Sequence, residues 1–241
     1  MIGIVGFGRF GKLMASYFTP DFTVMAYDTE DKSAEMLATG ASPASLEEVC
    51  RQKVVVLGVP ISILKDTLKT IAPLLLPGSL VVDVCSVKQY PFQWMKELLP
   101  ESVSFLPTHP MFGPDSAADS LKGRKIVLCK GRIEKSRYRK VKEYLVSKDL
   151  VVIETTPEEH DRNIAVSLSL THFIGRALSE FGAEKLHIDT EGYKRLLHIL
   201  GVVKNDTWQL FYDMNKYNPY AGEKRAAFLE AMQSIEKKLN A

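Results

Sequence analysis

The fold of this 241-residue chain is narrowed most by a glycine-rich segment near its start, Gly6-Phe7-Gly8-Arg9-Phe10-Gly11. It comes directly after the apolar run Ile2–Val5 and opens a stretch with helical periodicity over residues 10–18. Between a strand and a helix, glycines at these spacings allow a tight turn, close approach of the backbone to a pyrophosphate, and close helix–strand packing. The N-terminus of the helix then offers amide donors to the phosphates. The six residues therefore predict the cofactor loop of a dinucleotide-binding domain.

Short aliphatic runs alternate with amphipathic segments as far as residue 154. The runs that predict strands are Ile2–Val5, Thr23–Tyr27, Val54–Gly58, Leu80–Asp83, Val103–Leu106, Lys125–Leu128 and Leu150–Glu154. Most are nearly all apolar, as parallel strands covered on both faces are. The segments between them, such as 10–18 and 63–75, are helix-like. This alternation predicts an α/β domain over residues 1–155, with a doubly wound, mostly parallel sheet of the Rossmann type.

The pattern changes at Thr156-Pro157-Glu158-Glu159, where Thr156 and Glu159 can form a capping box and Pro157 suits the first helical position. Beyond this point only helices are predicted, at about 157–182, 190–200, 205–215 and 219–239. We expect residues 156–241 to form an all-α domain. Roughly 85 helical residues make a thin core, so we also expect this domain to pack against the first domain and to form a homodimer.

Asp28 ends the second predicted strand, at the distance expected of the carboxylate that binds the adenosine ribose hydroxyls. A carboxylate repels a 2′-phosphate, and no arginine follows within the next turn to receive one. We therefore expect NAD to be preferred over NADP. The segment Gly58-Val59-Pro60, at the end of the third predicted strand, is a second candidate wall of the cofactor site, although Pro60 would also suit a helix start.

A candidate catalytic histidine follows the fifth predicted strand, in the run Thr108-His109-Pro110-Met111-Phe112-Gly113-Pro114. We expect a loop made rigid by its prolines, at the sheet edge where ligands bind. An imidazole held there is a candidate acid or base near neutral pH, and a surface histidine on a turn is the alternative. Ser86 and Lys88 follow the fourth predicted strand at the same edge, as a candidate donor and a candidate positive charge. A helix cap and a solvated surface lysine are their alternatives.

In the first predicted helix of the second domain, Asp161, Leu168 and His172 are separated by seven and then four residues. In a regular α-helix they share one face. Two polar residues on an otherwise apolar face indicate the wall of a cleft. His160 beside them is expected to be no more than solvent-exposed.

Composition excludes several other classes of protein. Hydrophobic residues make up 46% and charged residues 25% of the chain, and the net charge of +2 indicates neither a nucleic-acid nor a membrane partner. The three cysteines, Cys50, Cys85 and Cys129, have no metal-binding spacing and are expected to be reduced thiols of a cytoplasmic protein. No metal site is predicted, and because the first residues already predict a strand, no signal peptide is expected.

Together these residues resemble the prephenate and arogenate dehydrogenases of tyrosine biosynthesis. The resemblance rests on the glycine-rich segment, Ser86-Val87-Lys88, the His109 run, and Glu159-His160-Asp161 with Thr171-His172-Phe173-Ile174-Gly175-Arg176. The segment Gly192-Tyr193-Lys194-Arg195-Leu196-Leu197, with Tyr217-Asn218, is most similar to plant-type arogenate enzymes. The resemblance implies a Rossmann domain, a helical dimerisation domain, and NAD(P)-dependent oxidative decarboxylation of arogenate or prephenate.

The resemblance also implies roles for individual residues. His109 matches the catalytic histidine, Ser86 the serine hydrogen-bonded near it, and His172 a histidine of the substrate pocket, with Lys88, Asp161 and Arg176 as further substrate-binding candidates. A neutral His109 would take the hydroxyl proton, so activity is expected to fall at acid pH. Many prephenate-specific relatives carry an arginine that clamps the side-chain carboxylate. The nearest position here is His198, and Arg176, Lys194 and Arg195 are alternative candidates for the missing cation. Without that guanidinium, prephenate has a weaker anchor and arogenate is the more attractive substrate.

Two other functions fit part of the pattern. A 3-hydroxyacid or imine dehydrogenase would have a similar two-domain plan, but these enzymes commonly place a lysine on the helix where this chain has His172. A dinucleotide sensor without turnover would need the glycine-rich segment and Asp28, but would have no use for His109 in a stiffened loop.

Overall fold

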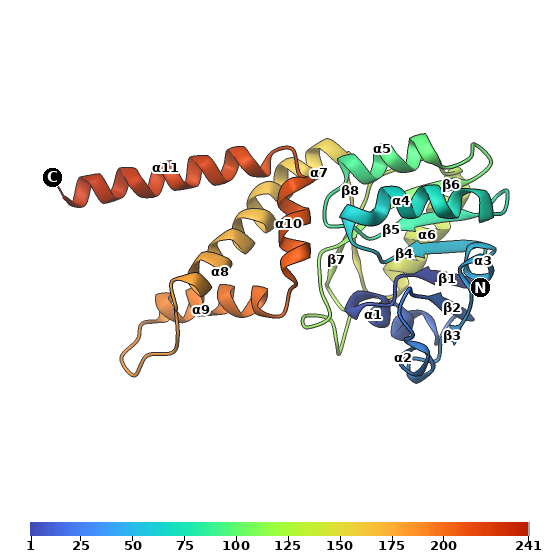
Figure 1. The fold of residues 1–241 in the computed structure, drawn as a ribbon, viewed down its shortest axis with the longest axis horizontal. Helices are drawn as coiled ribbons and strands as arrows, with labels where there is room; N and C mark the ends of the chain where they lie inside the picture. The colour runs from blue at the N-terminus through green and yellow to red at the C-terminus, as the bar shows by residue number, and fades with distance from the viewer. Residues whose placement is uncertain (241) are drawn as a thin grey trace. The chain divides into compact units, whose positions relative to one another are not determined.

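A computed structural model describes residues 1–240 of the chain. It divides into two compact units, Met1–Pro157 and the residues from Glu158 onward, whereas the sequence placed the boundary between residues 155 and 156. The first unit contains a sheet with helices on both faces, and the second contains helices (Figure 1).

The first unit is built on one eight-stranded sheet, in the order β3-β2-β1-β4-β5-β6-β7-β8. Its strands are β1 Ile2–Val5, β2 Val24–Tyr27, β3 Ser42–Pro43, β4 Val54–Leu57, β5 Leu80–Asp83, β6 Ser104–Pro110, β7 Lys125–Leu128 and β8 Val151–Glu154. Neighbouring strands are parallel except for β6 and β7, which pair antiparallel. The predicted fold class is confirmed. The sequence missed β3, because a two-residue strand has no periodicity to recognise.

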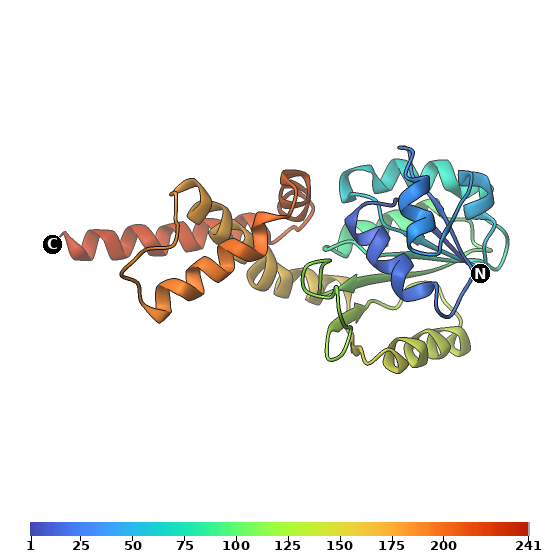
Figure 2. The same cartoon turned by 90° about the horizontal axis from the view of Figure 1, so that it is seen from below.

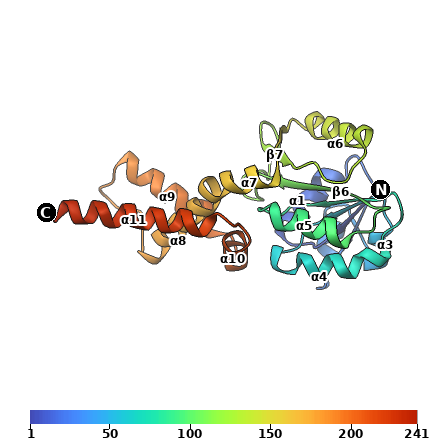
Figure 3. The same ribbon diagram turned by 90° about the horizontal axis from the view of Figure 1, so that it is seen from above.

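Helices cover both faces of this sheet. They are α1 Arg9–Phe18, α2 Ser33–Ala38, α3 Leu46–Cys50, α4 Ile61–Ile71 with the 3-10 turn η1 Ala72–Leu74, α5 Gln89–Leu98 and α6 Lys135–Ser147. Helix α6 lies on one side of the sheet, and α4 and α5 pack together on the other (Figures 2 and 3). Helices α1 and α6 share their face, since side chains of both surround Val54, Val56 and Val82. The core consists of apolar strand residues, such as Ile4, Leu80 and Leu106, packed between these layers.

Strand β6 is longer than predicted and includes His109, so the expectation that this histidine lies in a loop was wrong. The first half of β6 pairs with β5, as far as the register pair Asp83↔Pro107. From Thr108 to Pro110 it continues beyond the end of β5 and pairs with β7, with His109 opposite Val127. Prolines normally argue against a central strand, which is why the sequence pattern ended the strand early. His109 nevertheless lies beyond the carboxyl end of β5, at the edge where it was expected.

The second unit contains α7 Pro157–Ile164, the π-helical segment η2 Ala165–Leu170, α8 Thr171–Glu180, α9 Glu191–Lys204, α10 Trp208–Lys216 and α11 Ala221–Leu239. No strand occurs between residues 158 and 240, in agreement with the prediction. Helices α8 and α9 pack closely at Gly175, where a Cβ would lie 2.7 Å from Cγ2 of Val203.

The π-helical segment changes which residues share a face. The predicted alignment of Asp161 with His172 assumed 3.6 residues per turn throughout. A π turn holds an extra residue, which rotates the residues after it by on the order of 100°. The regular spacing therefore does not hold, although both side chains are buried. His160 is buried too, contrary to the expected exposure, and the carboxylate of Asp161 accepts a hydrogen bond from its ring.

Candidate active site

Three predicted cofactor residues form a row at the carboxyl ends of three adjacent strands. Gly6, Asp28 and Gly58 each come one residue after β1, β2 and β4. The last residues of these strands lie side by side in the register pairs Val5↔Tyr27 and Val5↔Leu57. The N–H of Gly6 donates to the carbonyl of Tyr27 (2.9 Å), and that of Gly58 donates to the carbonyl of Val5 (2.8 Å). Sheet hydrogen bonding thus continues into the predicted cofactor edge.

The glycines between β1 and α1 have the properties that a pyrophosphate cradle requires. Gly6 has φ +94°, and a Cβ there would lie 2.7 Å from the carbonyl oxygen of Gly58. A Cβ at Gly11 would lie 2.3 Å from the carbonyl oxygen of Gly6, which shows how closely α1 packs on the loop. At Gly8 a Cβ would meet no described atom within 4 Å. The N-terminus of α1 is therefore open at Gly8, and its first turn carries no acidic side chain.

The other residues of the glycine-rich segment act through packing and salt bridges. Phe7 is fully buried and its main-chain N–H donates to Oδ2 of Asp28 (2.6 Å). Phe10 is half-buried, with its ring centroid 6.2 Å from that of Phe112. Arg9 is exposed and pairs with Asp115 (2.5 Å). Phe7 and Phe10 therefore anchor the loop by packing, whereas the charged side chain of Arg9 lies at the surface.

Asp28 already has protein partners. Besides the N–H of Phe7, the N–H of Glu30 donates to its other oxygen (3.0 Å), and Nζ of Lys32 lies 3.8 Å from its Oδ2. Sequence reasoning looked for an arginine here and passed over Lys32, although its i, i+4 spacing from Asp28 could have pointed to it.

The second candidate wall of the cofactor site leads into a helix. Gly58 contacts the glycine-rich loop, and Cγ1 of Val59 would lie 3.0 Å from a Cβ at Gly6. Pro60 is the N-cap residue of α4. The expected helix start is therefore present, and Gly58 and Val59 lie beside Gly6, where a second wall of the cofactor site remains a prediction.

His109 and Ser86 extend the same edge toward β5 and β6. His109 is 5% exposed and lies two residues past the register pair Asp83↔Pro107, whereas Ser86 lies three residues past it on the other strand. The Ser86 hydroxyl oxygen is buried and has no hydrogen-bond partner within residues 1–240. Buried polar atoms normally have a partner, so an orphan hydroxyl at this edge suits contact with a ligand.

Lys88 is fully buried rather than solvated. Its ammonium donates hydrogen bonds to the carboxylate of Asp83 and to the main-chain carbonyl of Thr108. The hydroxyl of Thr108 donates to the carbonyl of Asp83 (2.6 Å). The surface-lysine alternative is thereby excluded, and the Lys88 ammonium instead links β5 to β6. Sequence reasoning missed the partners Asp83 and Thr108, because their contacts exist only once the two strands pair.

In the second unit, Asp161 belongs to a buried polar group. Its Oδ1 lies 2.7 Å from Nδ1 of His160, and its main-chain carbonyl accepts a hydrogen bond from the side chain of Asn218 (2.9 Å). Asn218 comes from the turn before α11. These contacts hold α7 to the start of α11.

His172 is buried beside charged groups of α8 and of the turn before α10. Its Nδ1 has no hydrogen-bond partner among the described residues and lies 3.8 Å from Oδ2 of Asp206. Burial, followed by the positive charge of Arg176, lowers the pKa of His172 to about 4. The carboxylate of Asp206, 3.8 Å away, acts in the opposite direction, but burial is the dominant cause. His172 is therefore a neutral imidazole near pH 7.

Arg176 is fixed by two contacts in the second unit. Its guanidinium donates to the main-chain carbonyl of Asp206 and lies over the ring of Trp208, 4.4 Å from the centroid. Its Nε is buried without a described partner. The other basic candidates, Lys194, Arg195 and His198, are exposed on α9, and Lys194 pairs with Glu191 (2.8 Å). Arg176 is the candidate that lies next to His172 in the structure.

In the described part of the chain, no three His, Cys, Asp or Glu side chains gather as metal ligands would. Nor does any helix within residues 1–240 combine the length and apolarity needed to cross a membrane.

Sequence comparison finds similar proteins for both units. A family model described as "Prephenate dehydrogenase, nucleotide-binding domain" matches residues 17–154, and one described as "TYRAAT1-like, C-terminal domain" matches residues 177–241. Arogenate dehydrogenase 1, chloroplastic, of Arabidopsis thaliana is 34% identical over 249 residues, which are 99% of this chain and 39% of that protein. Arogenate dehydrogenase 2, chloroplastic, of the same plant is 32% identical over 251 residues, 99% of this chain and 69% of that protein. This chain thus spans well under half of the first relative.

Solved structures share the fold. Prephenate dehydrogenase from A. aeolicus, in complex with hydroxyphenyl propionate and NAD+, has a TM-score of 0.74 and 22% identity, with 98% of this chain and 87% of that chain covered. Synechocystis arogenate dehydrogenase has a TM-score of 0.69 and 20% identity, with 99% and 89% covered. At these identities the likeness concerns the fold.

Proposed function

This chain belongs to the prephenate dehydrogenase family, and on that premise we propose that it catalyses the NAD(P)-dependent oxidative decarboxylation of arogenate, prephenate or both in tyrosine biosynthesis. The observation that carries the proposal is the position of His109. His109 lies just past the end of β5, at the same sheet edge where Gly6, Asp28 and Gly58 form a row. A base beside a dinucleotide cradle is the arrangement that an alcohol oxidation requires.

The first unit fits a nicotinamide dinucleotide. The open N-terminus of α1 at Gly8 suits the pyrophosphate, and Asp28 suits a ribose hydroxyl. NAD is the preferred cofactor in this proposal, because the carboxylates of Asp28 and Glu30 both oppose a 2′-phosphate and Lys32 is paired with them. When bound, the nicotinamide ring accepts a hydride, which is the chemistry that the cofactor supplies.

His109 acts as the general base in this mechanism. As a neutral imidazole it takes the proton of the substrate's 4-hydroxyl group while the ring carbon that bears this group is oxidised. The bond to the ring carboxylate then breaks, carbon dioxide leaves, and the ring becomes aromatic, which makes the reaction effectively irreversible. Ser86, whose buried hydroxyl lacks a described partner, donates to the substrate or orients the imidazole.

Lys88 has a positioning role in this proposal instead of the substrate contact expected from the sequence. Its side chain has no exposed surface, and its ammonium is used by Asp83 and Thr108. A direct contact with substrate would require breaking this buried ion pair. By bonding both Asp83 and Thr108, Lys88 fixes the position of the strand segment that carries His109.

His172 and Arg176 are the substrate-binding candidates of the second unit. A neutral His172 can hydrogen-bond a hydroxyl or carboxylate group through a ring nitrogen, and Arg176 supplies the adjacent positive charge. The buried carboxylate of Asp161 already contacts His160. In this proposal Asp161 therefore orients the imidazole of His160 and does not contact the substrate itself.

A homodimer formed by the helical unit completes the proposal. Every residue from Leu229 to Asn240, which form the last part of α11 and its C-cap, is exposed. This stretch includes an apolar stripe, with exposures between 45% and 78%, made of Leu229, Met232, Ile235 and Leu239. A second subunit would bury such a stripe. We place the protein in a reducing, cytoplasmic environment, in line with its three buried cysteine thiols.

Activity with the two candidate substrates tests the proposal directly. The purified protein is mixed with NAD and either arogenate or prephenate, and NADH formation is followed by absorbance. We expect turnover with at least one of them, with arogenate the better substrate. Binding of NAD without turnover of either would overturn the proposal in favour of a dinucleotide sensor.

A further inference from the structure

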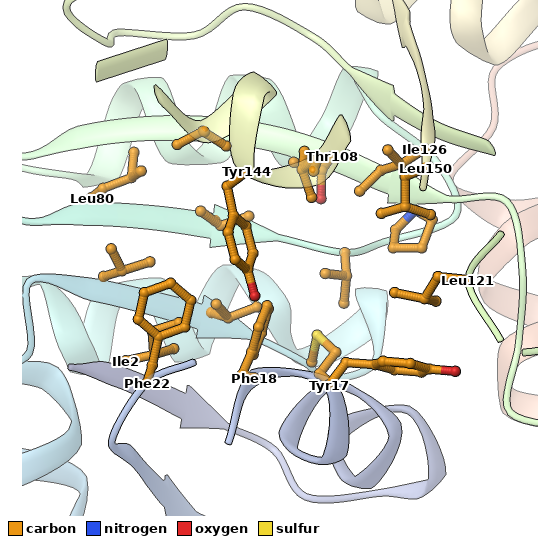
Figure 4. Close-up of a pocket in the computed structure, with 18 of the residues that line it drawn as sticks. Ile2, Tyr17, Phe18, Phe22, Leu80, Thr108, Leu121, Ile126, Tyr144 and Leu150 are labelled. Atoms are coloured by element: carbon orange, nitrogen blue, oxygen red, sulfur yellow. The ribbon is translucent and has the colours of Figure 1, made fainter. Parts of the chain in front are cut away.

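An apolar cavity of the first unit lies on the sheet face that α1 and α6 cover, and extends from the first residues of β1 and β4 to Thr108 and Pro110 on either side of His109. Its volume is about 440 Å³, which is in the range of small-molecule sites. The close-up in Figure 4 shows its wall formed by side chains of the strands, such as Leu80 and Ile126, and by aromatic side chains of α1 and α6, Tyr17, Phe18 and Tyr144. Protein interiors are normally packed without voids of this size, so a bound ligand is expected to fill the cavity.

The interior of this cavity offers almost nothing to a polar ligand. Apart from aliphatic and phenyl groups it is lined by two tyrosines and Thr108, whose hydroxyls already have partners. The hydroxyl of Tyr17 donates to the carbonyl of Ala117 (2.8 Å) and that of Tyr144 to the carboxylate of Asp21 (2.9 Å), while that of Thr108 donates to Asp83. A sugar, nucleotide or amino acid would lose its hydrogen bonds with water there, so the body of the occupant must be apolar.

Basic side chains collect at the end of the cavity beside the first residues of β1 and β4. Lys53, Arg137 and Lys140 line this end together with Met1. Lys53 and Lys140 are exposed, and neither forms an ion pair with any described residue. The guanidinium of Arg137 bonds to main-chain carbonyls, those of Gly78 (2.6 Å) and Lys53 (2.8 Å). This end is therefore positively charged.

Acidic groups near this end do not cancel its charge. Asp21, which accepts from Tyr144, is paired with Lys148 (2.5 Å). Glu134, the N-cap residue of α6, acts electrostatically on Arg137, but it accepts a hydrogen bond from Ser136 (2.6 Å) and does not line the cavity. An apolar chamber with a cationic mouth is complementary to a molecule with an apolar tail and one anionic head.

We propose that this cavity is a second ligand site of the protein, for a medium-chain fatty acid or a monocarboxylate of similar shape. The tail occupies the space between α1, α6 and the sheet, and the carboxylate lies at Lys53, Arg137 and Lys140. Its charged mouth lies where β1 and β4 begin, whereas the proposed cofactor edge lies where these strands end. Binding of the proposed ligand requires neither nicotinamide cofactor nor turnover.

Calorimetric titration of the whole protein, without cofactor, tests the proposal with three probes that share one tail. These are decanoate, decan-1-ol and decyltrimethylammonium, each used below the concentration at which it aggregates. We expect saturable binding of one decanoate per chain, with decan-1-ol about tenfold weaker because a charge-assisted contact is lost. Absence of saturable decanoate binding, or equal affinity for the cationic probe, would overturn the proposal.

Substitutions locate the bound molecule. Val82→Phe and Val56→Phe each add a ring inside the cavity, and we expect decanoate affinity to fall by about tenfold or more with the melting temperature retained. The double variant Lys53→Glu/Lys140→Glu removes two cations at the mouth and should weaken decanoate more than decan-1-ol. Lys135→Glu on α6 is the matched control, since Lys135 does not line this cavity, and its affinity should equal that of the unmodified protein. If one variant fails to fold, the remaining variants still test the proposal. Unchanged decanoate affinity in every folded filling and mouth variant would contradict the assignment.

Discussion

The buried ammonium of Lys88 donates a hydrogen bond to the main-chain carbonyl of Thr108, the residue directly before His109. The same ammonium pairs with Asp83, the last residue of β5. The ion pair therefore joins β5 and β6 at the point where β6 leaves one neighbouring strand and begins to pair with the other. The strand segment that presents His109 is held by an interaction between buried charges, not by the prolines alone.

Removing one partner of this pair should be costly. In Lys88→Met the carboxylate of Asp83 stays buried without its cation, so we expect the free energy of unfolding to fall by about 3–5 kcal/mol. Urea denaturation measures the loss. The double variant Lys88→Met/Asp83→Asn should be more stable than Lys88→Met, because a neutral amide can still accept the hydrogen bond from Cys85 N–H. Equal losses in the single and double variants would show that the buried charge is not the cause.

The proposed base predicts a loss of turnover when the imidazole is removed. In His109→Ala we expect kcat to fall by about 10²–10⁴-fold with KM little changed, because general-base help is removed while binding contacts remain. Initial rates of NADH formation give both constants. His187→Ala, at an exposed position, is the control and should retain full activity. A His109→Ala enzyme with near-normal kcat would exclude this residue as the base.

Cofactor preference should depend on Asp28. In Asp28→Ser the carboxylate that opposes a 2′-phosphate is gone and Lys32 loses one partner, so the ratio of kcat/KM for NAD to that for NADP should fall about tenfold or more. Glu30→Gln is the control, since its exposed carboxylate shares Lys32 but bonds no loop amide, and we expect a smaller change. Comparable kcat/KM values with both cofactors in the unmodified enzyme would refute the NAD preference.

The neutral, buried His172 predicts a specific dependence of stability on pH. Its pKa is lowered to about 4 in the folded protein, from 6.5 in the unfolded chain. Between these values the unfolded chain binds a proton that the folded protein does not. The stabilisation is thus complete above pH 6.5 and is lost as the pH falls toward 4, with a total of about 3 kcal/mol.

Comparing unfolding free energies at pH 7 and pH 4.5 in the unmodified protein and in His172→Gln measures this dependence. The unmodified protein should lose more stability than the variant over this interval, because glutamine does not titrate. His187→Gln, which changes an exposed histidine, should behave like the unmodified protein. The same loss in all three proteins would show that His172 titrates normally.

The exposed apolar stripe of α11 predicts that charged residues placed on it abolish the proposed dimer. The double substitution Met232→Asp/Ile235→Asp places two charges on the stripe without touching the core of the first unit, so we expect a monomer with an intact nucleotide-binding domain. Light scattering after gel filtration gives the mass, and NAD titration tests the domain. Gln233→Asp, a polar exchange on the same helix, is the control. An unmodified protein that is monomeric at all concentrations would remove the proposed dimer.

The sequence alone determined the fold class and the order of the elements. Apolar runs separated by amphipathic segments give buried parallel strands, because only covering helices on both faces allow such strands. Gly6, Gly8 and Gly11 indicated a cradle because their conformational and steric demands are local to a few residues. The position of Asp28 could be predicted too, since it follows from where a strand ends.

The tertiary structure decided whatever depends on partners distant in the sequence. Strand pairing with β7 turned the predicted His109 loop into part of β6, and it buried Lys88 between Asp83 and Thr108. The π turn rotated His172 away from its predicted alignment with Asp161, and neighbouring helices buried both. Spacing along a chain specifies local conformation, whereas burial and charge pairing arise only when separate elements meet and exclude water.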